Sequence, residues 1–535
     1  MDNIESACRD LVEQLLRKEI TTEQELNAAK KAVSIRYKLS SLLSNSRILT
    51  AAAEEEKPAV LDLLQLKPVR TLSGVAVIAA MTSPAPCPHG LCVPCPGGPG
   101  SKFQSPQSYM GAEPAARRAF ENEFDPYKQV CSRLGQLVQI GHPIEKAEFI
   151  VMGGTYTSRM LCYQEWFVKR AIEAMNDFYG TAWREGKGSY ISVEEVQSAN
   201  ENARVRNVGI TIETRPDWTE IEHIDTILGL GATKVEIGVQ NTYDFILAGI
   251  QRGHTVKQSV EANARLRDTG LKVGFHMMPG LPGSTCDSDL RMFRTLFEDE
   301  RFKPDYLKIY PTLVTEGTRL HGMWELGNYE PFEVEEAVEL LAKVKSFLPK
   351  WVRLQRIQRD IPAYQVLAGI KKSNLRQLAK QRLTNLGGKC RCIRCREVGH
   401  SDAEPGNVEL VSEKYMACGG MEHFISFEDV EKDILIGFIR LRFPHAPHRQ
   451  ELAGAALVRE LHVYGSMVPP GGSATDAQWQ HRGYGEELLA HAEETARDAG
   501  YEKIAVMSGI GVRDYYRKSG YGREGPYMTK RLMNL

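Results

Sequence analysis

The chain has 535 residues, which is too long for one ordinary hydrophobic core, so two or three domains are expected. Hydrophobic residues make up 42% of it and charged residues 25%, as in globular proteins that function in water. The net charge of −1 gives no sign of a nucleic-acid partner by itself. No apolar run approaches about eighteen residues, and the opening MDNIESACRDLVEQLLRKE lacks the apolar core of a signal peptide. We therefore expect a cytoplasmic protein that does not enter a membrane.

Residues 1–60 carry apolar positions at helical spacing and predict a helical N-terminal extension. Over 61–349, short β-rich runs such as AEFIVMGG, NVGITIETRP and TKVEIGVQ alternate with helical segments. That alternation predicts βαβ units around a parallel sheet or barrel. A basic segment covers 350–399 and is predicted to be a hinge between two domains. From 400 to 535, longer strands and one amphipathic helix predict a second domain of the α+β class.

Eleven cysteines in a chain expected in the cytosol indicate metal binding or catalysis before disulfides. Three of them, Cys87, Cys92 and Cys95, lie within CPHGLCVPCPGGPG. Three thiolates on one loop suit an iron–sulfur cluster in which one iron has no protein ligand. A structural zinc ion with His89 as fourth ligand is the alternative that this spacing alone leaves open.

The cysteine loop and the strands after it resemble radical SAM enzymes, although four residues separate the first two cysteines and the usual motif has three. The resemblance implies a partial (β/α)6 barrel whose [4Fe–4S] cluster is held by these cysteines and binds S-adenosylmethionine. Catalytic groups in such barrels gather at the carboxyl ends of strands. The resemblance therefore implies that several residues at strand ends line this site: Gly153, Gly154, Thr155, Glu213, Glu236 and Gln240.

The basic segment has eight Lys or Arg residues between Arg353 and Arg382, against one acid, Asp360. A charge run is usually a solvated helix face, but here the balancing acids are missing, which favours contact with phosphates.

The same segment holds a second cysteine group, Cys390, Cys392 and Cys395. Tetrahedral zinc needs one more ligand, for which His400 and Cys418 are the candidates. We expect a structural zinc ion at the hinge.

A glycine-rich turn, QHRGYG, precedes a long amphipathic helix near the C-terminus. Backbone N–H groups at such a turn attract phosphates, and the helix dipole adds to the attraction. Together with ELHVYG and GVRDYYRKSGYG, the turn resembles the GNAT acetyltransferase fold over 400–535. The resemblance implies an acetyl-CoA site formed by Glu460, Leu461, His462, Val463, Gln480, Gly483, Tyr484, Gly485 and Glu486. Tyr515 and Tyr516 are both candidates for the acid that protonates the leaving thiolate, and core packing is the alternative.

With both halves in view, the chain resembles the catalytic subunit of the Elongator complex in its stand-alone archaeal or bacterial form. The strings that carry the resemblance include CVPCPGG, EFIVMGGT, ITIETRPD, HMMPGLPG, LKIYPT and ELHVYG. It implies conversion of the wobble uridine of tRNA to 5-carboxymethyluridine, in which a radical from S-adenosylmethionine takes hydrogen from the acetyl methyl group of acetyl-CoA. It also places Lys146 at a barrel-side contact with acetyl-CoA. Because such a transfer is short, we expect the two domains to pack with their site mouths facing each other.

The expected macromolecular partner is the anticodon region of tRNA, bound through Arg353, Arg356, Arg359, Lys371, Lys372 and Arg376. Tyr310 and Tyr364 are candidates to stack on a base splayed from the loop, and core packing fits them equally. We expect the chain to act alone or as a homo-oligomer. Two other functions compete, a protein lysine acetyltransferase with a structural iron–sulfur domain and a tRNA-binding scaffold subunit. The presence of both cofactor motifs favours the enzyme.

Overall fold

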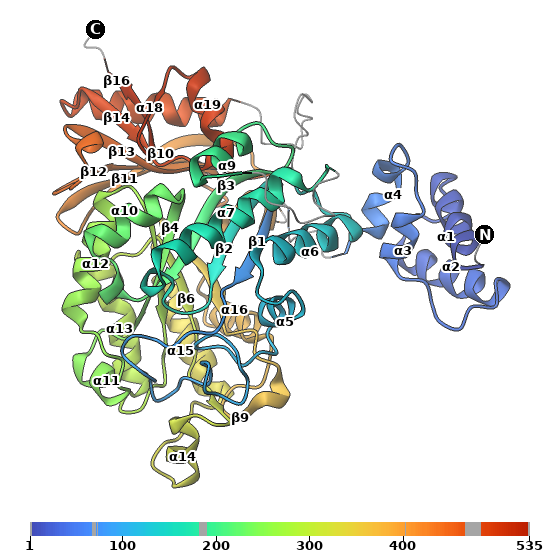
Figure 1. The fold of residues 1–535 in the computed structure, drawn as a ribbon, viewed down its shortest axis with the longest axis horizontal. Coiled ribbons are helices and arrows are strands. Elements are labelled where there is room, and N and C mark those ends of the chain that lie inside the picture. Colours follow the sequence, from blue (N-terminus) through green and yellow to red (C-terminus); the bar gives the residue numbers. More distant parts are fainter. Residues whose placement is uncertain are drawn as a thin grey trace.

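The computed structural model describes residues 3–66, 71, 73–180, 190–401, 403–465 and 483–532. Within these ranges no helix is both long and apolar enough to cross a bilayer. The described chain forms an N-terminal helical unit, a parallel barrel and a C-terminal α+β domain (Figure 1).

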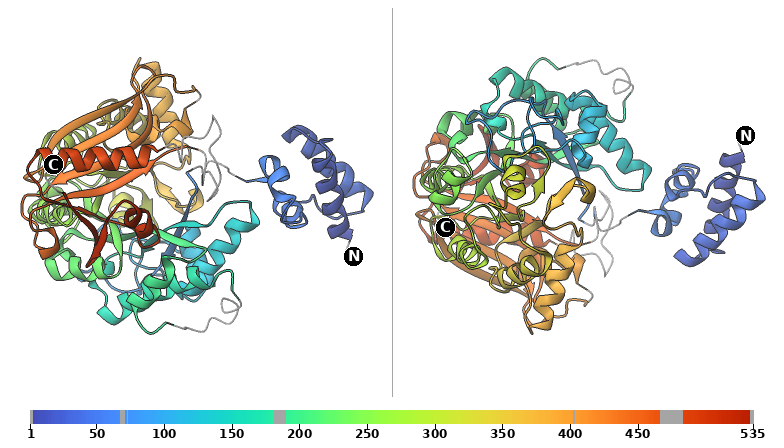
Figure 2. Two further views of the ribbon diagram at one scale, coloured as in Figure 1. Left: turned by 90° about the horizontal axis from the view of Figure 1, so that it is seen from above. Right: turned by 90° about the horizontal axis from the view of Figure 1, so that it is seen from below.

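The N-terminal unit is a small helical bundle with a core of its own, centred on Leu11, Val12 and Ile48. Its helices are α1 (Asn3–Leu16), α2 (Glu23–Arg36), α3 (Asn45–Thr50) and α4 (Lys57–Leu64). The unit stands to one side of the rest of the molecule in all views (Figures 1 and 2). It contacts the barrel where Gln65 Nε2 donates to the Gly141 carbonyl at 3.0 Å.

The barrel is an open, curved sheet of parallel strands with β1 at one edge and β8 at the other. In spatial order the described strands are β1 (Val75–Met81), β2 (Lys146–Met152), β3 (Arg206–Thr214), β4 (Ala232–Gln240), β5 (Lys272–Met277), β6 (Tyr306–Ile309) and β8 (Arg353–Ile357). β8 shows that the sheet reaches into the basic segment. A small antiparallel pair, β7 (Val314–Thr315) and β9 (Val366–Ala368), follows the end of β6.

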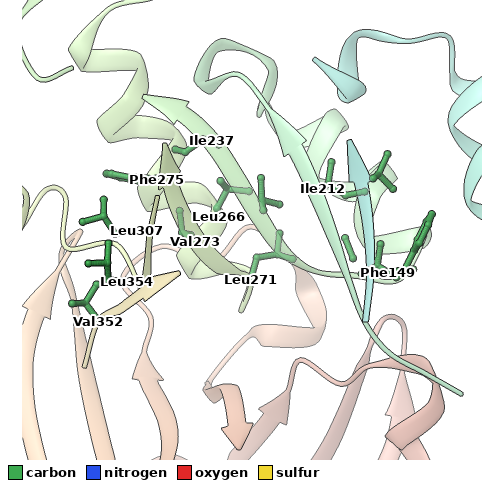
Figure 3. Close-up of a cluster of buried hydrophobic side chains, with 14 of the residues drawn as sticks. Phe149, Ile212, Ile237, Leu266, Leu271, Val273, Phe275, Leu307, Val352 and Leu354 are labelled. Atoms are coloured by element: carbon green, nitrogen blue, oxygen red, sulfur yellow. The ribbon is translucent and has the colours of Figure 1, made fainter. Parts of the chain in front are cut away.

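Helices cover the outer face of this sheet, because every second strand residue is apolar and points outward. Val235 and Ile237 of β4, for example, belong to the buried core, and Ile237 is labelled in Figure 3. Lys234 and Glu236 of the same strand point into the lumen. The described helices of this domain are α5 (Pro114–Glu121), α6 (Pro126–Gln139), α7 (Leu161–Asp177), α9 (Val193–Asn200), α10 (Ile221–Gly229), α11 (Asp244–Gly249), α12 (Val256–Asp268), α13 (Cys286–Glu298), α14 (Arg319–Glu325), α15 (Val334–Ser346), α16 (Leu375–Asn385) and α17 (Ile393–Arg396).

The C-terminal domain is a second mixed sheet covered by α18 (Tyr484–Asp498) and α19 (Arg513–Lys518). In spatial order its strands are β10 (Val408–Ala417), β11 (Gly420–Asp429), β12 (Ile434–Phe443), β13 (Ala455–Val463), β14 (Lys503–Val506), β16 (Tyr527–Arg531) and β15 (Gly522–Glu524). Only β13 and β14 run parallel, and their pairing ends at Val458 and Val506. β13 continues to Val463 along β12 alone, so the sheet splays at this point.

Buried ion pairs join the two large domains, and we call this set the ion-pair seam. Its members are all at most 6% exposed: Arg267, Asp268 and Asp305 of the barrel with Glu422, Arg440, Arg442 and Arg459 of the C-terminal domain. Arg459 donates to both Asp305 oxygens at 2.6 and 2.8 Å, and Arg442 pairs with Asp268 at 2.6 Å. Burial alone would raise the pKa of Asp305, but the surrounding arginines hold it well below its usual range.

The C-terminal domain packs against the amino ends of the barrel strands. Asp305 directly precedes β6, and the Leu271 carbonyl that accepts from Arg459 directly precedes β5. The arrowheads of the barrel strands accordingly point away from the C-terminal sheet (Figure 3). The expectation that the two domains pack mouth to mouth is therefore wrong, because the carboxyl mouth of the barrel lies at the opposite end.

Removal of one carboxylate from the ion-pair seam should destabilise the whole two-domain unit. In Asp305→Asn the buried guanidinium groups lose their counter-charge, so we expect the free energy of unfolding to fall by about 3–5 kcal/mol. Because the pKa of Asp305 is lowered in the folded state, its contribution exists above the pKa of an unfolded aspartate and is lost as the pH falls below it.

Denaturant titrations at pH 7 and below pH 4 measure both effects. Asp498→Asn, at an exposed position at the end of α18, is the matched control and should change stability by less than about 0.5 kcal/mol. Equal stability of Asp305→Asn and wild type at pH 7 would contradict the role given to the seam.

Candidate functional site

The first cysteine loop follows β1 and lies at the carboxyl mouth of the barrel. Tight turns fold it, since the Gly90 amide donates to the Cys87 carbonyl and the Cys95 amide to the Cys92 carbonyl, both at 3.0 Å. Val93 anchors the loop in an apolar cluster with Ile250 and others, and its amide donates to the Ile250 carbonyl at 2.9 Å.

Each of the three cysteine sulfurs has a polar side chain beside it. The nearest contacts are Thr155 Oγ1 to Cys87 at 3.6 Å, His89 Nε2 to Cys92 at 3.0 Å, and Gln107 Nε2 to Cys95 at 3.4 Å. The Arg252 guanidinium also lies 3.6 Å from the sulfur of Cys92. Donors and positive charge around thiolates are what a negatively charged iron–sulfur cluster requires, so this set fits one.

Burial and charge also act on the ionisable groups of the loop. Burial raises the pKa of the Cys87 thiol, while the hydrogen bond of Thr155 opposes the rise. Burial and the positive charges of Arg215 and Arg252 lower the pKa of His89 to about 4, so its imidazole is neutral at pH 7. His89 contacts Cys92 and is neither exposed nor charged at that pH.

The glycines after β2 bring two backbone segments close together. Gly153 has φ +130°, and a Cβ there would collide with the Thr82 side chain at the end of β1. Gly154 has φ +98° and lies against Gln107 of the cysteine loop, while Thr155 reaches Cys87. The structure thus brings these residues beside the cysteines.

Inside the mouth, the strand-end acids form a connected network with a lysine. Lys308 bridges Glu236 and Glu213, the second at 3.5 Å, and His276 Nε2 lies 3.0 Å from Glu236. Tyr109 of the cysteine loop donates to Glu213 at 3.0 Å. Burial would raise the pKa of Glu236, but Lys308 and its other partners hold it well below its usual range.

This network also decides what the pair Glu213 and Glu236 can bind. Together with His276 they offer ligand atoms within 4.8 Å of one another, close enough for one cation. The Lys308 ammonium already lies between the two carboxylates, so it supplies the positive charge. Tyr310, whose ring meets His276 edge-on at 5.5 Å, completes the mouth. Gln240 ends β4 with φ +68°, a left-handed conformation that is rare outside glycine.

Charged side chains continue through the lumen to the C-terminal domain. Lys234 Nζ lies 3.7 Å from Glu236 and 4.8 Å from the ring centre of Tyr306. The Tyr306 hydroxyl in turn donates to Glu460 of β13. A file of polar groups therefore runs from the cysteine mouth to the far end of the barrel, where Lys146 begins β2.

At that far end, β13 and β14 of the C-terminal domain splay apart. The backbone of Glu460 to Val463 lies beyond the last β14 pair. Gly483 caps α18 with φ +87°, and a Cβ on Gly485 would lie 2.9 Å from the Tyr515 hydroxyl and 3.8 Å from Val463. Helix start, splayed strand and tyrosine thus converge. Gln480, also predicted here, lies outside the described residues.

The two candidate tyrosines differ in their surroundings. Tyr516 is 6% exposed and packs in the domain core against Tyr521. The Tyr515 hydroxyl is buried beside Gly485 without a hydrogen-bond partner among the described residues. Burial, and to a lesser degree Glu486, raises the pKa of Tyr515 to about 12, so the hydroxyl keeps its proton at pH 7.

The second cysteine group has the compact geometry of a site for a single ion. The sulfurs of Cys390, Cys392 and Cys395 all lie within 4.8 Å of one another. Neither proposed fourth ligand joins them: His400 pairs with Glu397 at 2.8 Å, and Cys418 lies beside Asn263 at 3.0 Å. Both alternatives for the fourth ligand are thus corrected, because each side chain is held elsewhere.

Several arginines of the basic segment are engaged within the protein. Arg353 donates to Glu397 and to the Tyr464 hydroxyl, Arg356 to Asp360, and Arg359 to the Ser108 carbonyl. Arg376 donates to the Leu354 carbonyl at 3.2 Å. The inference that balancing acids are missing is wrong, because tertiary contacts bring Glu397 from outside the counted run. Lys371 and Lys372 are exposed, as is Tyr364 at 79%.

Comparisons with known proteins match the chain to four family models. The chain matches models of the ELP3 N-terminal domain over residues 4–72, the radical SAM superfamily over 87–296, the radical SAM C-terminal domain over 304–385 and the GNAT acetyltransferase family over 399–521. A tRNA uridine(34) acetyltransferase of Methanocaldococcus jannaschii is 50% identical over 498 residues, covering 91% of this chain and 90% of that protein. Elongator complex protein 3 of Saccharomyces cerevisiae is 42% identical, with 98% and 96% covered.

The chain belongs to the Elongator complex protein 3 family. A solved structure of Methanocaldococcus infernus Elp3 lacking its N-terminus superposes with a TM-score of 0.75 at 45% identity, covering 86% of this chain and all of that one. The resemblance drawn from the motifs and the expected fold class are confirmed. The radical SAM and GNAT domains of the family imply an iron–sulfur cluster, S-adenosylmethionine and acetyl-CoA.

Sequence reasoning missed several residues of the mouth: Tyr109, Arg252, His276 and Lys308. Two of them carry a readable signal, since Lys308 precedes Tyr310 by two positions and His276 follows a buried Phe275, so both must face the lumen. Tyr109 lies in a long irregular loop, where no periodicity shows its direction.

Replacement of Lys308 by methionine should expose its electrostatic role. Two buried carboxylates then lose their shared ammonium, so we expect the free energy of unfolding at pH 8 to fall by about 3 kcal/mol or more. The pKa of Glu236 should rise, so the loss should shrink as the pH falls and both proteins protonate this group. Denaturant titration at several pH values measures this.

Lys343→Met, on the exposed face of α15, is the control and should lower the free energy of unfolding by less than about 0.5 kcal/mol. A loss of stability in Lys308→Met that does not depend on pH would contradict the assignment.

Proposed function

We propose that this protein modifies the wobble uridine of tRNA to 5-carboxymethyluridine, using S-adenosylmethionine radical chemistry and acetyl-CoA. The observation that carries the proposal is the presence of both candidate cofactor sites in one unit, in which the ion-pair seam joins the barrel to the C-terminal domain. The name of the archaeal relative, tRNA uridine(34) acetyltransferase, supports the choice of substrate.

At the carboxyl mouth, Cys87, Cys92 and Cys95 would hold a [4Fe–4S] cluster, with S-adenosylmethionine bound at the Gly153 turn. When bound, these groups supply one-electron cleavage and a radical able to take hydrogen from carbon. The chain itself supplies position and charge. Glu213 and Tyr310 face the space above the lumen, where Lys308 Nζ lies 3.5 Å from a Glu213 carboxylate oxygen.

At the amino end, the splayed backbone of Glu460 to Val463 and the helix start at Gly483 would hold acetyl-CoA. At this candidate site we assign the proton donor to Tyr515, because its buried hydroxyl keeps its proton at pH 7 and lies beside Gly485. Tyr516 then has a structural role in the core of the C-terminal domain. Lys146, at the barrel end that faces this domain, would supply a second contact with acetyl-CoA.

The tRNA anticodon would approach the carboxyl mouth. β9 packs in the same apolar cluster as Val93 of the cysteine loop, so the exposed Lys371 and Lys372, a few residues after β9, flank that mouth. Tyr364 precedes β9 and offers an exposed ring for base stacking. We therefore assign phosphate contacts to these two lysines and internal roles to Arg353 and the other arginines that have partners within the protein.

The second cysteine group would hold a structural zinc ion with a ligand from outside the chain or from water in the fourth position. The reaction is placed in the cytoplasm, where the chain acts alone or as a homo-oligomer.

Anaerobic reconstitution tests the function. The full chain is incubated with iron, sulfide, reductant, S-adenosylmethionine, acetyl-CoA and tRNA, and nucleosides are analysed by mass spectrometry. We expect 5-carboxymethyluridine from wild type and at least a hundredfold less from Cys92→Ala and Gly483→Glu. Tyr515→Phe, which removes one hydroxyl, should lower the rate by about 10²–10⁴-fold, whereas Tyr516→Phe should stay within a few-fold.

The outcomes separate the alternatives. Formation of 5′-deoxyadenosine without a modified uridine would support the radical chemistry and show that the substrate is another molecule. Acetylated protein substrates without either product would favour the lysine acetyltransferase.

The assignment of tRNA contacts predicts a charge effect without loss of fold. The double variant Lys371→Ala/Lys372→Ala should weaken tRNA binding and reduce the slope of log affinity against log salt concentration by about 1–2, because each phosphate contact releases condensed counterions. Filter binding or fluorescence anisotropy over a salt series measures this. Lys257→Ala, an exposed lysine on α12, is the control; an unchanged slope in the double variant would refute the contact.

A further inference from the structure

A histidine within the cysteine loop carries the further inference. His89 is one of the four residues between Cys87 and Cys92. The loop is one residue longer than the usual radical SAM spacing, and His89 is the member of that longer stretch that reaches back to a cysteine. Its Nε2 atom lies 3.0 Å from the sulfur of Cys92.

The proton position on this imidazole follows from its other neighbour. Arg215 Nη1 lies 2.5 Å from His89 Nδ1. A guanidinium group has only donors, so Nδ1 must accept, and the proton of a neutral ring is then on Nε2. The imidazole N–H therefore faces the Cys92 sulfur.

Arg215 is itself fixed in place, which makes this orientation rigid. It donates to both carboxylate oxygens of Asp217 at 2.9 and 2.8 Å and to the Arg252 carbonyl at 2.7 Å. Its side chain is 3% exposed. Arg215 follows the end of β3, so the barrel strand, and not the cysteine loop, fixes the orientation of the His89 imidazole.

The chain also makes room for the ring on the other side. Gly253 has φ +75°, and a Cβ there would lie 2.6 Å from the Cβ of His89. Arg252, the residue before it, places its guanidinium 3.6 Å from the same sulfur of Cys92. Histidine, glycine and the two arginines thus form one packed support for a single cysteine.

We propose that His89 is a positioning residue for the iron–sulfur cluster, whose Nε2–H donates a hydrogen bond to the cluster-bound sulfur of Cys92 and raises the reduction potential. Hydrogen bonds to cluster sulfurs are among the terms that set this potential, because they stabilise the additional negative charge of the reduced form. The inference rests on the cluster part of the proposed function. It is independent of the substrate that the radical acts on.

Two substitutions separate the hydrogen bond from the shape of the ring. His89→Phe keeps a ring and removes the donor, whereas His89→Gln offers an amide that can accept from Arg215 and donate to Cys92. The full chain with each substitution is loaded with cluster anaerobically and titrated by spectroelectrochemistry, together with iron and sulfide analysis. His491→Phe, on α18 of the C-terminal domain, is the control for the substitution itself.

We expect a lower reduction potential in His89→Phe and a value close to wild type in His89→Gln and His491→Phe. Loss of the cluster from His89→Phe but not from His89→Gln, at an unchanged thermal unfolding midpoint, would also support the hydrogen bond. A loaded His89→Phe with the wild-type potential would overturn the proposal. So would equal loss of cluster from both His89 variants, because an amide able to make the same hydrogen bonds would then fail to preserve the cluster. None of these readouts uses tRNA modification, so failure of the proposed function would be seen separately.

Discussion

Where the barrel meets the C-terminal domain, seven charged side chains are removed from water, and partners across the interface and within each domain replace their hydration. A buried charge left without its partner is costly, so a relative shift of the two domains would break several pairs of the ion-pair seam at once. The seam thereby fixes the orientation of the C-terminal sheet on the amino ends of the barrel strands. Everything else in the molecule that involves both domains depends on this fixed orientation.

The lumen of the barrel is the second consequence of that arrangement. With the C-terminal domain at one end and the cysteine loop at the other, the inward-facing strand residues lie between the two candidate sites. They alternate in charge along the axis, from Glu213 through Lys308, Glu236 and Lys234 to the Tyr306–Glu460 pair. Each charge is balanced by its neighbour, which keeps the interior polar without a net excess that would require counter-ions.

The sequence predicts the fold class and one of the two cysteine sites. The alternation of β-rich and helical runs gives the parallel barrel, and the spacing of Cys87, Cys92 and Cys95 gives a cluster loop at a strand end. A local sequence pattern does not predict the partner of a side chain when that partner comes from a distant part of the chain. Arg353 looks like part of an unbalanced basic run, but Glu397 and Tyr464 reach it only in the folded state. His400 and Cys418 are near the second cysteine group in sequence or in the adjacent domain, yet Glu397 and Asn263 hold them.

The position of the domains has one further consequence, which concerns the order of events in a reaction cycle. The candidate acetyl-CoA site at Gly485 and the mouth at Glu213 lie at opposite ends of the barrel. A small cofactor could be exchanged at the amino end while a large polymeric substrate stays at the carboxyl mouth. Kinetically, such a layout permits the small ligand to bind or leave without dissociation of the large one.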